Sequence, residues 1–317
     1  MSNGMPSRRG GTLVIVLATL VPLCFAGWLV WRSAQGSDEG ASATPSVSGS
    51  SESDRGSPTT PERSGKPTPS PESGDKGEKD ESDEEGAKQR NRSLRGMTVV
   101  IDPGHNPKNK NHPDKINQTV DIGTNEKACD TTGTATNSGY PEAEFTLDIA
   151  QRASKQLRAR GATVKLTQDG DRAWGPCIDE RALIGNKAEA DAVVSIHADG
   201  STQGNQGFHV ILPASVHEGK ADTSAITGPS RRLGEALADG YHAATDVPTA
   251  NYLGDSDGLV TRDDLGGLNL SKVPKVFLEC GNMRNPREAA RFTDPQWRAR
   301  AADGIVRGIT DFLAGER

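Results

Sequence analysis

The chain has 317 residues, a formal net charge of −6 and 33% hydrophobic residues, and its apolar residues are unevenly distributed. The negative charge argues against a general nucleic-acid-binding protein, which would normally carry a basic face. Neither a GxGxxG segment nor a Walker-type loop occurs, which argues against a bound nucleotide cofactor. The part of the chain from about residue 96 onward is long enough for one domain with a full core.

The N-terminus contains an uncharged apolar run from Thr12 to Trp31. A run of about 20 residues can cross a bilayer as a helix. Because Arg8 and Arg9 precede it, we expect residues 1–11 in the cytoplasm and residues 12–31 as a membrane anchor. A cleaved signal peptide is the alternative, although the run ends in bulky residues rather than a small-x-small site. Either interpretation places the rest of the chain on the cell-wall side of the membrane, anchored or secreted.

Residues 32–95 are rich in Ser, Pro, Gly and acidic residues and contain almost no apolar ones. Such a segment cannot bury enough apolar surface to offset its ordering entropy, so we expect it to be disordered. Repulsion within its acidic stretch should extend it. The sequence therefore predicts a tether that is followed by one folded domain at residues 96–317.

Within that domain, apolar runs alternate with segments of helical periodicity. The apolar runs predict strands at residues 97–101, 162–166, 191–196, 207–212 and 275–279. The 3.6-residue spacing of apolar positions predicts helices at residues 142–160, 179–190, 230–244 and 295–313. This alternation predicts an α/β fold with a mostly parallel, twisted sheet flanked by helices. In such sheets the site lies beyond the carboxyl ends of the strands.

Four polar residues stand at the ends of apolar runs or beside tight turns. His105 follows Val-Val-Ile-Asp-Pro-Gly, His197 follows Val-Val-Ser-Ile, Glu279 follows Val-Phe-Leu, and Glu142 opens a predicted helix after Tyr-Pro. Two histidines and a carboxylate with one open position form a catalytic zinc site, and a second carboxylate nearby can act as its base. In combination the four segments favour zinc-dependent hydrolysis.

Each carboxylate also has an ordinary structural explanation. Glu142 could simply stabilise the start of its helix through the helix dipole. Glu144 is a rival ligand, but it lies about 200° round the helix from Glu142, so only one of the two should reach the site. Glu142 is preferred because it begins the helix beside the turn. A carboxylate at the position of Glu279 needs a partner, and Arg284 could provide it through a salt bridge.

The remaining histidines have weaker sequence contexts. We expect His112, His217 and His242 at the surface. His209 lies in a predicted strand that faces the same region as His197, so it is a candidate to support the site indirectly.

The chain has four cysteines, one of them, Cys24, within the apolar N-terminal run. Cys129 and Cys177 lie in loop-like contexts, whereas Cys280 ends a predicted buried strand. Disulfides persist outside the cytoplasm, so we expect Cys129 and Cys177 to be bridged and Cys280 to be free. The rival interpretation, that Cys129 is a metal ligand, is less favoured because better ligands are already present.

The segments from about residue 96 to residue 313 resemble the zinc-dependent N-acetylmuramoyl-L-alanine amidases of the amidase-3 family, and most closely the mycobacterial type. The resemblance is carried by residues 99–105, Glu142, residues 179–181, 194–198, 207–208 and 279–285, and by Asn137-Ser-Gly-Tyr-Pro, Gly175-Pro-Cys and Leu268-Asn-Leu. It implies His105, Glu142 and His197 as zinc ligands, Glu279 as the catalytic glutamate and peptidoglycan as the substrate. It also supports the bridge between Cys129 and Cys177.

The sequence departs from the family pattern at a few positions. Cys280 stands where many relatives have an apolar residue, and Ala143 follows Glu142 where many have Lys. The polar segment between His105 and Glu142 is long enough to cover the site in part.

We therefore expect a membrane-tethered enzyme that hydrolyses the amide between N-acetylmuramic acid and L-alanine. A zinc peptidase that cuts within the stem peptide, and a non-catalytic or regulated wall-binding module, remain as alternatives.

Overall fold

The computed structural model describes residues 93–254 and 257–315. The predictions for the cytoplasmic N-terminus, the anchor and all but the end of the linker lie outside these residues. Within the described ranges, no helix combines the length and apolar character that a membrane crossing requires.

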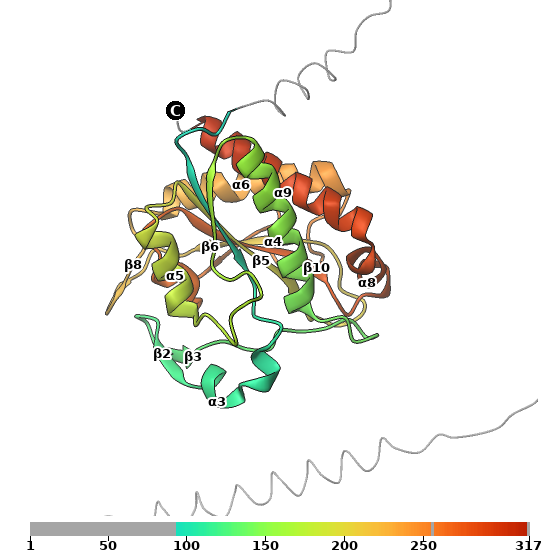
Figure 1. The fold of residues 1–317 in the computed structure, drawn as a ribbon, viewed down its shortest axis with the longest axis horizontal. Coiled ribbons are helices and arrows are strands. Elements are labelled where there is room, and N and C mark those ends of the chain that lie inside the picture. The colour runs from blue at the N-terminus through green and yellow to red at the C-terminus, as the bar shows by residue number, and fades with distance from the viewer. Residues whose placement is uncertain (1–92, 255–256, 316–317) are drawn as a thin grey trace, which may run out of the picture. The chain divides into compact units, whose positions relative to one another are not determined.

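The described part of the chain is built on one six-stranded sheet (Figure 1). Four neighbouring strands run parallel, the fifth is antiparallel to them, and the sixth runs parallel to the fifth. In spatial order they are β4 (Thr163–Leu166), β1 (Thr98–Pro103), β5 (Ala192–Asp199), β10 (Lys275–Asn282), β6 (His209–Pro213) and β9 (Leu259–Arg262). The predicted α/β fold with a mostly parallel sheet is confirmed.

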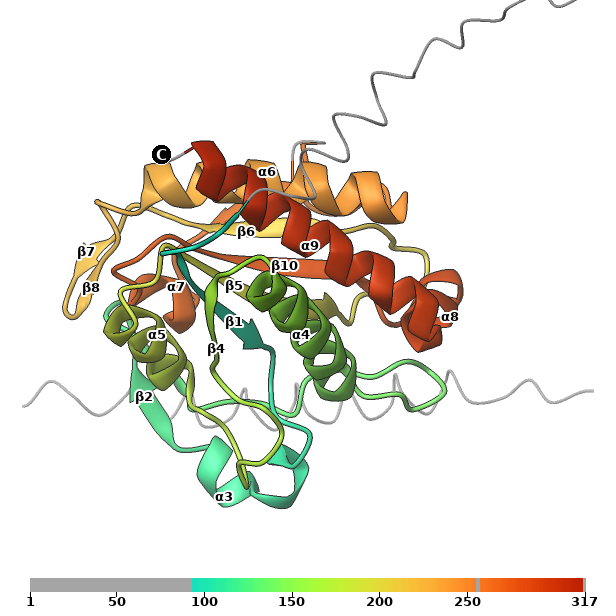
Figure 2. The ribbon, with the colours of Figure 1, turned by 45° about the horizontal axis from the view of Figure 1, so that its top comes forward.

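Three long helices cover one face of the sheet: α4 (Glu142–Ala159), α6 (Thr227–Thr245) and α9 (Pro295–Gly315), with α9 packed beside both of the others (Figure 2). Their apolar stripes meet one set of alternating strand residues, among them Val99, Ile101 and Val194. The opposite face carries Val100 and Val193, which pack under α5 (Ile178–Lys187). Because helices lie over both faces, the central strands are continuous apolar runs, as parallel strands usually are.

The remaining elements are short. Between His105 and Glu142, beyond the carboxyl end of β1, lie η1 (Asn109–Asn111), α3 (Pro113–Ile116), β2 (Thr119–Asp121) and β3 (Glu126–Ala128) (Figures 1 and 2). The other short elements are α7 (Gly266–Asn269), α8 (Pro286–Thr293), β7 (His217–Glu218) and β8 (Ala221–Asp222). The segment predicted only as a polar loop thus has local secondary structure.

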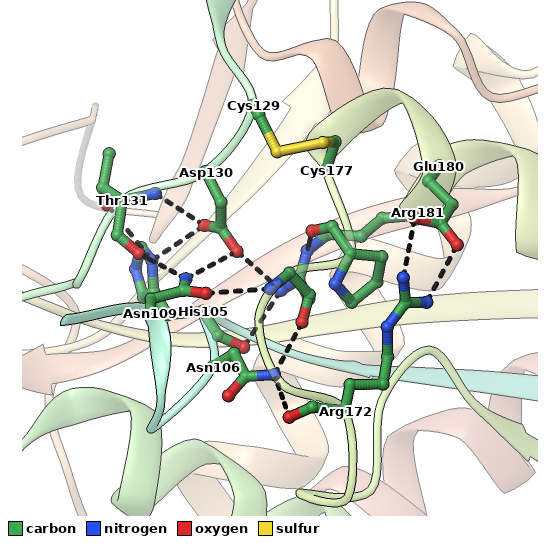
Figure 3. The surroundings of a disulfide bond; sticks show 12 residues. His105, Asn106, Asn109, Cys129, Asp130, Thr131, Arg172, Cys177, Glu180 and Arg181 are labelled. Carbon is green, nitrogen blue, oxygen red and sulfur yellow. Dashed lines mark hydrogen bonds and ion pairs between the residues drawn. A yellow bond between two sulfur atoms is a disulfide. The ribbon is translucent and has the colours of Figure 1, made fainter. Parts of the chain in front are cut away.

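The disulfide prediction is confirmed, because Cys129 and Cys177 are bonded and Cys280 is free and buried. The bond joins the residue after β3 to the residue that precedes α5 (Figure 3). Cys129 is therefore a structural cross-link and is not a metal ligand. The bridge attaches the segment between His105 and Glu142 to the body of the domain.

Element types were predicted correctly, whereas several boundaries differ. Helix α5 ends at Lys187 rather than at residue 190, and Glu189 adopts a positive φ of 47° that no α-helix continues through. Strand β6 begins at His209 rather than at residue 207, because Gly207 has a φ of 98° and donates its N–H to Glu288 instead. The edge strand β9 was not predicted.

Candidate active site

A row of polar side chains crosses the sheet near the carboxyl ends of its parallel strands. Glu279 on β10 is paired in register with His197 on β5 and with His209 on β6. Directly paired residues on neighbouring strands point to the same face, so these three side chains share the α5 side of the sheet. This is the edge at which the parallel topology predicts a site.

His105 enters this row from the turn that follows β1. Its φ of 61° lies in the left-handed region, which non-glycine residues adopt only rarely. The turn is fixed by a 2.9 Å hydrogen bond from the Gly104 N–H to the Ile196 carbonyl. A side chain at Gly104 would overlap the ring of His197, so glycine is required for the two histidine-bearing segments to approach each other.

Glu142, at the start of α4, lies between the two histidines. Its Oε1 is 3.3 Å from His105 Nε2 and 3.0 Å from His197 Nδ1, while its Oε2 accepts a 2.8 Å hydrogen bond from the Thr134 N–H. One ligand atom from each of the three side chains lies within 4.8 Å of the others, which makes them a group that could hold a metal ion. Glu144 is exposed and does not reach this group.

The three groups form a tight electrostatic unit. Burial alone would raise the pKa of Glu142, but His105 and His197 outweigh it and hold that pKa well below its usual range. Burial would lower the pKa of His105, but Glu142 and Asp130 raise it to about 10. The ligand atoms thus attract positive charge, which a bound cation would supply in place of protons.

Glu279 lies in a different electrostatic environment. Burial, followed by the nearby carboxylates of Glu142 and Asp199, raises its pKa well above the usual value. The salt bridge considered for Glu279 is wrong, because Arg284 directs its Nη1 to Asn137 Oδ1 at 3.3 Å. In the part of the chain that the structure describes, Glu279 forms no ion pair. Charge repulsion thus acts on the residue that the sequence marked as a candidate base.

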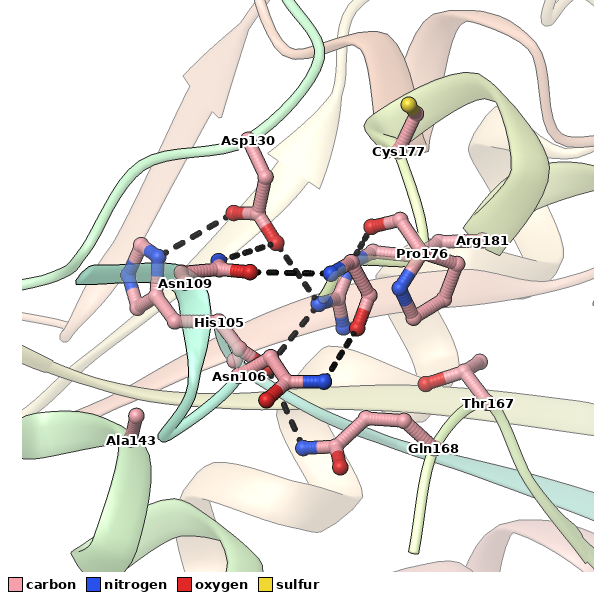
Figure 4. A network of polar contacts seen from close by, with 12 residues as sticks. His105, Asn106, Asn109, Asp130, Ala143, Thr167, Gln168, Pro176, Cys177 and Arg181 are labelled. Carbon is pink, nitrogen blue, oxygen red and sulfur yellow. Dashed lines mark hydrogen bonds and ion pairs between the residues drawn. The ribbon is translucent and has the colours of Figure 1, made fainter. Parts of the chain in front are cut away.

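A second polar network, which the sequence did not reveal, lies beside His105 (Figures 3 and 4). His105 Nδ1 is 3.2 Å from Asp130 Oδ1 and 3.2 Å from the Thr131 carbonyl. Arg181 contacts Asp130 Oδ2 at 3.0 Å and also donates to the carbonyls of Pro103 and His105. Arg181 stood within a segment that carried the family resemblance, whereas Asp130 had no sequence signal of its own.

Below this network lies a fully buried ion cluster around Asp102. Arg181 Nη1 is 2.7 Å from Asp102 Oδ1, and Lys275 Nζ is 3.1 Å from Asp102 Oδ2. The hydroxyls of Thr167 and Ser195 donate to the same carboxylate. Burial would raise the pKa of Asp102, but Lys275 and Arg181 outweigh it and hold that pKa far below its usual range.

Two cavities adjoin the histidine–glutamate group. One of about 270 Å³ is lined by His105, His197, Phe277 and the backbone of Gly266 and Gly267. Phe277 stacks on the His197 ring with a centroid separation of 5.1 Å. The other, of about 260 Å³, is lined by residues 132–135, Lys110 and Arg284. The segment between His105 and Glu142 supplies walls to both cavities, so it shapes access to the site.

The other histidines lie where the sequence placed them, with one exception. His217 and His242 are exposed, whereas His112 is only half-buried rather than fully at the surface. His209 is 2% exposed, and its Nδ1 has no hydrogen-bond partner among the described residues. Burial lowers its pKa to about 4, so the ring is neutral at pH 7.

The fold and this site define an α/β enzyme with a candidate metal centre at its strand ends. Residues 99–311 match the amidase-3 family model, which is described as N-acetylmuramoyl-L-alanine amidase. The chain belongs to this family, and it is accordingly a peptidoglycan amidase.

Relatives with known names and structures agree with this assignment. The N-acetylmuramoyl-L-alanine amidase Rv3717 of Mycobacterium tuberculosis is 41% identical over 223 residues, which cover 70% of this chain and 88% of that protein. The crystal structure of the amidase Ami1 of Mycobacterium smegmatis matches with a TM-score of 0.65 at 40% identity, covering 70% of this chain and 99% of that one. The apo form of Ami1 from Mycobacterium abscessus matches with a TM-score of 0.64 at 40% identity, covering 69% and 100%.

Proposed function

We propose that the protein is a zinc-dependent amidase that is tethered outside the cytoplasmic membrane and releases stem peptides from peptidoglycan. The bond cleaved is the amide between the lactyl group of N-acetylmuramic acid and the first L-alanine. The observation that carries the proposal is the convergence of His105, Glu142 and His197, with Glu279 on the adjacent strand.

The donor set fits zinc. Two imidazole nitrogens and one carboxylate oxygen, with room for a fourth ligand, are the protein ligands of many catalytic zinc sites. His105 Nε2, His197 Nδ1 and Glu142 Oε1 would hold the ion. Bound zinc would supply Lewis acidity towards the scissile carbonyl and its attacking water.

Glu279 is the proposed general base. Its carboxylate would accept a proton from the attacking water and later donate that proton to the leaving amine of L-alanine. Burial and the neighbouring carboxylates raise its pKa, and a nearby cation would lower it again, in favour of the carboxylate that accepts the proton. The adjacent 270 Å³ cavity, with Phe277 along one wall, offers room for one arm of the substrate.

The proposed location rests on two features of the chain. The Cys129–Cys177 bridge is the kind of bond that persists outside the cytoplasm. The apolar run at residues 12–31 would anchor the chain, and residues 32–95 would serve as the tether. Fractionation of cells, followed by sequencing of the protein's N-terminus, tests the anchor. Recovery in the medium with a new N-terminus near residue 31 would show a secreted enzyme instead.

The activity is tested by incubating the full-length protein with purified peptidoglycan, with added zinc or with a chelator. Mass spectrometry should show chelator-sensitive release of intact stem peptides that carry a free N-terminal alanine. Fragments cut inside the peptide would establish the peptidase alternative. Bound zinc without any release would favour the wall-binding or regulated module, and removal of part of residues 106–141 would then test whether that segment blocks the site.

A further inference from the structure

We propose that Asp130 is a positioning residue for the metal centre, which orients His105 so that its Nε2 is left for the ion. The inference rests on the proposed zinc-dependent function. It adds a residue that lies outside the group of two histidines and Glu142, and it gives a purpose to the disulfide-linked network beside them (Figure 3).

Apart from His105, every hydrogen-bond partner of the Asp130 carboxylate in the described residues is a fixed donor. Oδ1 accepts from the Thr131 N–H at 2.8 Å and lies 3.2 Å from His105 Nδ1. Oδ2 accepts from Asn109 Nδ2 at 3.0 Å and from Arg181 Nη2 at 3.0 Å. An ionised carboxylate can only accept, so this arrangement places a proton on Nδ1 of His105.

The position of that proton decides which nitrogen can bind a metal. The carbonyl and the hydroxyl of Thr131 are each 3.2 Å from His105 Nδ1 as well. The carbonyl can only accept, and the hydroxyl oxygen has lone pairs with which it can accept, so both are compatible with an N–H at Nδ1. A neutral imidazole carries one proton, so an N–H at Nδ1 leaves the lone pair of Nε2 available. Nε2 is the nitrogen that faces Glu142, at 3.3 Å. The ring is therefore held in the form that a metal at this site requires.

The carboxylate itself is held in place by its surroundings (Figure 4). Asp130 is 5% exposed. Arg181 donates both to Asp130 and to the backbone carbonyl of His105, so one guanidinium fixes the ligand's main chain and the group that orients its ring. The disulfide joins Cys129, next to Asp130, to Cys177, which precedes the helix carrying Arg181. The bond thus keeps the segment that contains Asp130 close to the helix that contains Arg181.

A purely structural role would need only the contacts of Oδ2 with Arg181 and Asn109. Exchange of Asp130 for Asn separates the two roles if the amide oxygen stays at the Oδ2 position, where it still accepts from Arg181 and Asn109. The opposite orientation would place the NH₂ group against the charged Arg181 guanidinium, which has only donors, and is therefore disfavoured. If the NH₂ replaces Oδ1, it faces the Thr131 N–H and His105 Nδ1. His105 can then satisfy the amide only by accepting at Nδ1, which moves its proton to Nε2 and blocks the metal-binding nitrogen.

The test measures zinc affinity of the full-length protein by competition with a chromophoric chelator. Asp130→Asn should bind zinc 10- to 100-fold more weakly than the wild type, the range found when an outer partner of a metal ligand is removed. Asp148→Asn is the matched control, because Asp148 also pairs with two arginines, Arg152 at 2.8 Å and Arg298 at 2.6 Å. The control should bind zinc within about twofold of the wild type.

A measurement on the wild type keeps the inference testable if the variant does not fold. In the zinc-loaded protein, ¹⁵N NMR of the imidazole nitrogens should show a proton on His105 Nδ1 and the metal on Nε2. A metal on Nδ1, or wild-type zinc affinity in folded Asp130→Asn, would overturn the assignment of Asp130. Failure of the wild type to bind zinc would reject the proposed function instead, so the two failures can be told apart.

Discussion

Two clusters of charged groups lie on the same side of the sheet, and they are built in opposite ways. Around Asp102 every carboxylate oxygen is matched: Oδ1 accepts from Arg181 and Thr167, and Oδ2 accepts from Lys275 and Ser195. Around Glu279 the nearest charges include other carboxylates, and its pKa rises accordingly. The first cluster is complete without any addition, whereas the second is stabilised by a proton or by a bound cation.

This contrast separates a structural ion cluster from a functional one. Fully paired charges hold the backbone in place, whereas acids with perturbed pKa values and no matching charge are candidates for chemistry. Arg181 belongs to both regions, since one nitrogen binds Asp102 and another binds Asp130 beside His105. Through Arg181, the cluster around Asp102 thus helps to position the residues of the metal site. If this division is correct, substitutions in the two clusters should affect different properties.

The largest expected effect is on turnover, from Glu279→Gln. Loss of a general base lowers the rate by about 10²- to 10⁴-fold. Zinc content and fold should be retained, because the change keeps the shape of a side chain that forms no ion pair in the described ranges. Rates of stem-peptide release from peptidoglycan measure the effect, with Glu144→Gln, on the exposed side of α4, as the control. Turnover within tenfold of the wild type would remove Glu279 from the mechanism.

The complementary change in the matched cluster is Lys275→Met. Removal of one member of a buried ion pair costs about 3–5 kcal/mol of unfolding free energy, and the remaining contact with Arg181 favours the lower part of that range. The rate per folded molecule should change much less than in Glu279→Gln. Urea denaturation of the chelator-treated protein gives the stability. A stable variant with lost activity would show that the two clusters are not separable in this way.

Removal of the disulfide should also lower stability, because the bond holds together the polar network beside both clusters. Replacing Cys129 and Cys177 together by Ala should lower the unfolding free energy by about 2–4 kcal/mol, since the bridge closes a loop across a separation of 48 residues. Thermal and urea unfolding measure the loss, and Cys280→Ala serves as the control for a cysteine that is not bridged. Equal stability of the double variant and the wild type would mean that the network alone holds the segment.

The sequence predicted the residues of the metal site much better than the residues that support them. His105, His197 and Glu279 each follow an apolar run, so the parallel topology alone brings them to one edge of the sheet. Glu142 could be preferred over Glu144 only from its place at the helix start, and the packed structure was needed to show that Glu144 is exposed. Spatial convergence of residues far apart in the chain was predictable because strand order constrains it.

The supporting residues were not predictable in the same manner. Lys275 begins an apolar strand and looks like an ordinary strand boundary, yet it is fully buried against Asp102. Asp130 lies in a segment without periodicity, and its role depends on a turn, a disulfide and the distant Arg181 meeting at one point. Such contacts are set by tertiary packing and leave no local pattern, so only the structure reveals them.

The smallest effect, and the one that compares the clusters directly, is the pH dependence of stability in the metal-free protein. Glu279 has a raised pKa, so the folded state binds more protons than the unfolded state, and stability falls as pH rises above about 4.5. Asp102 has a depressed pKa, so its contribution is present above about pH 4 and is lost as pH falls further. Glu279 and Asp102 therefore act in opposite directions on the pH axis.

Glu279→Gln should isolate the first of these effects. Its unfolding free energy should equal that of the wild type near pH 4 and exceed it increasingly towards pH 7, by up to about 1.4 kcal/mol for each unit that separates the two pKa values. Acid unfolding below pH 4 should be the same in both proteins, because Asp102 is intact. Urea denaturation between pH 3.5 and 7.5 measures both the difference at higher pH and the shared loss of stability at low pH. A difference that stays constant with pH would mean that Glu279 is not protonated in the metal-free fold, and the contrast between a matched and an unmatched cluster would then fail.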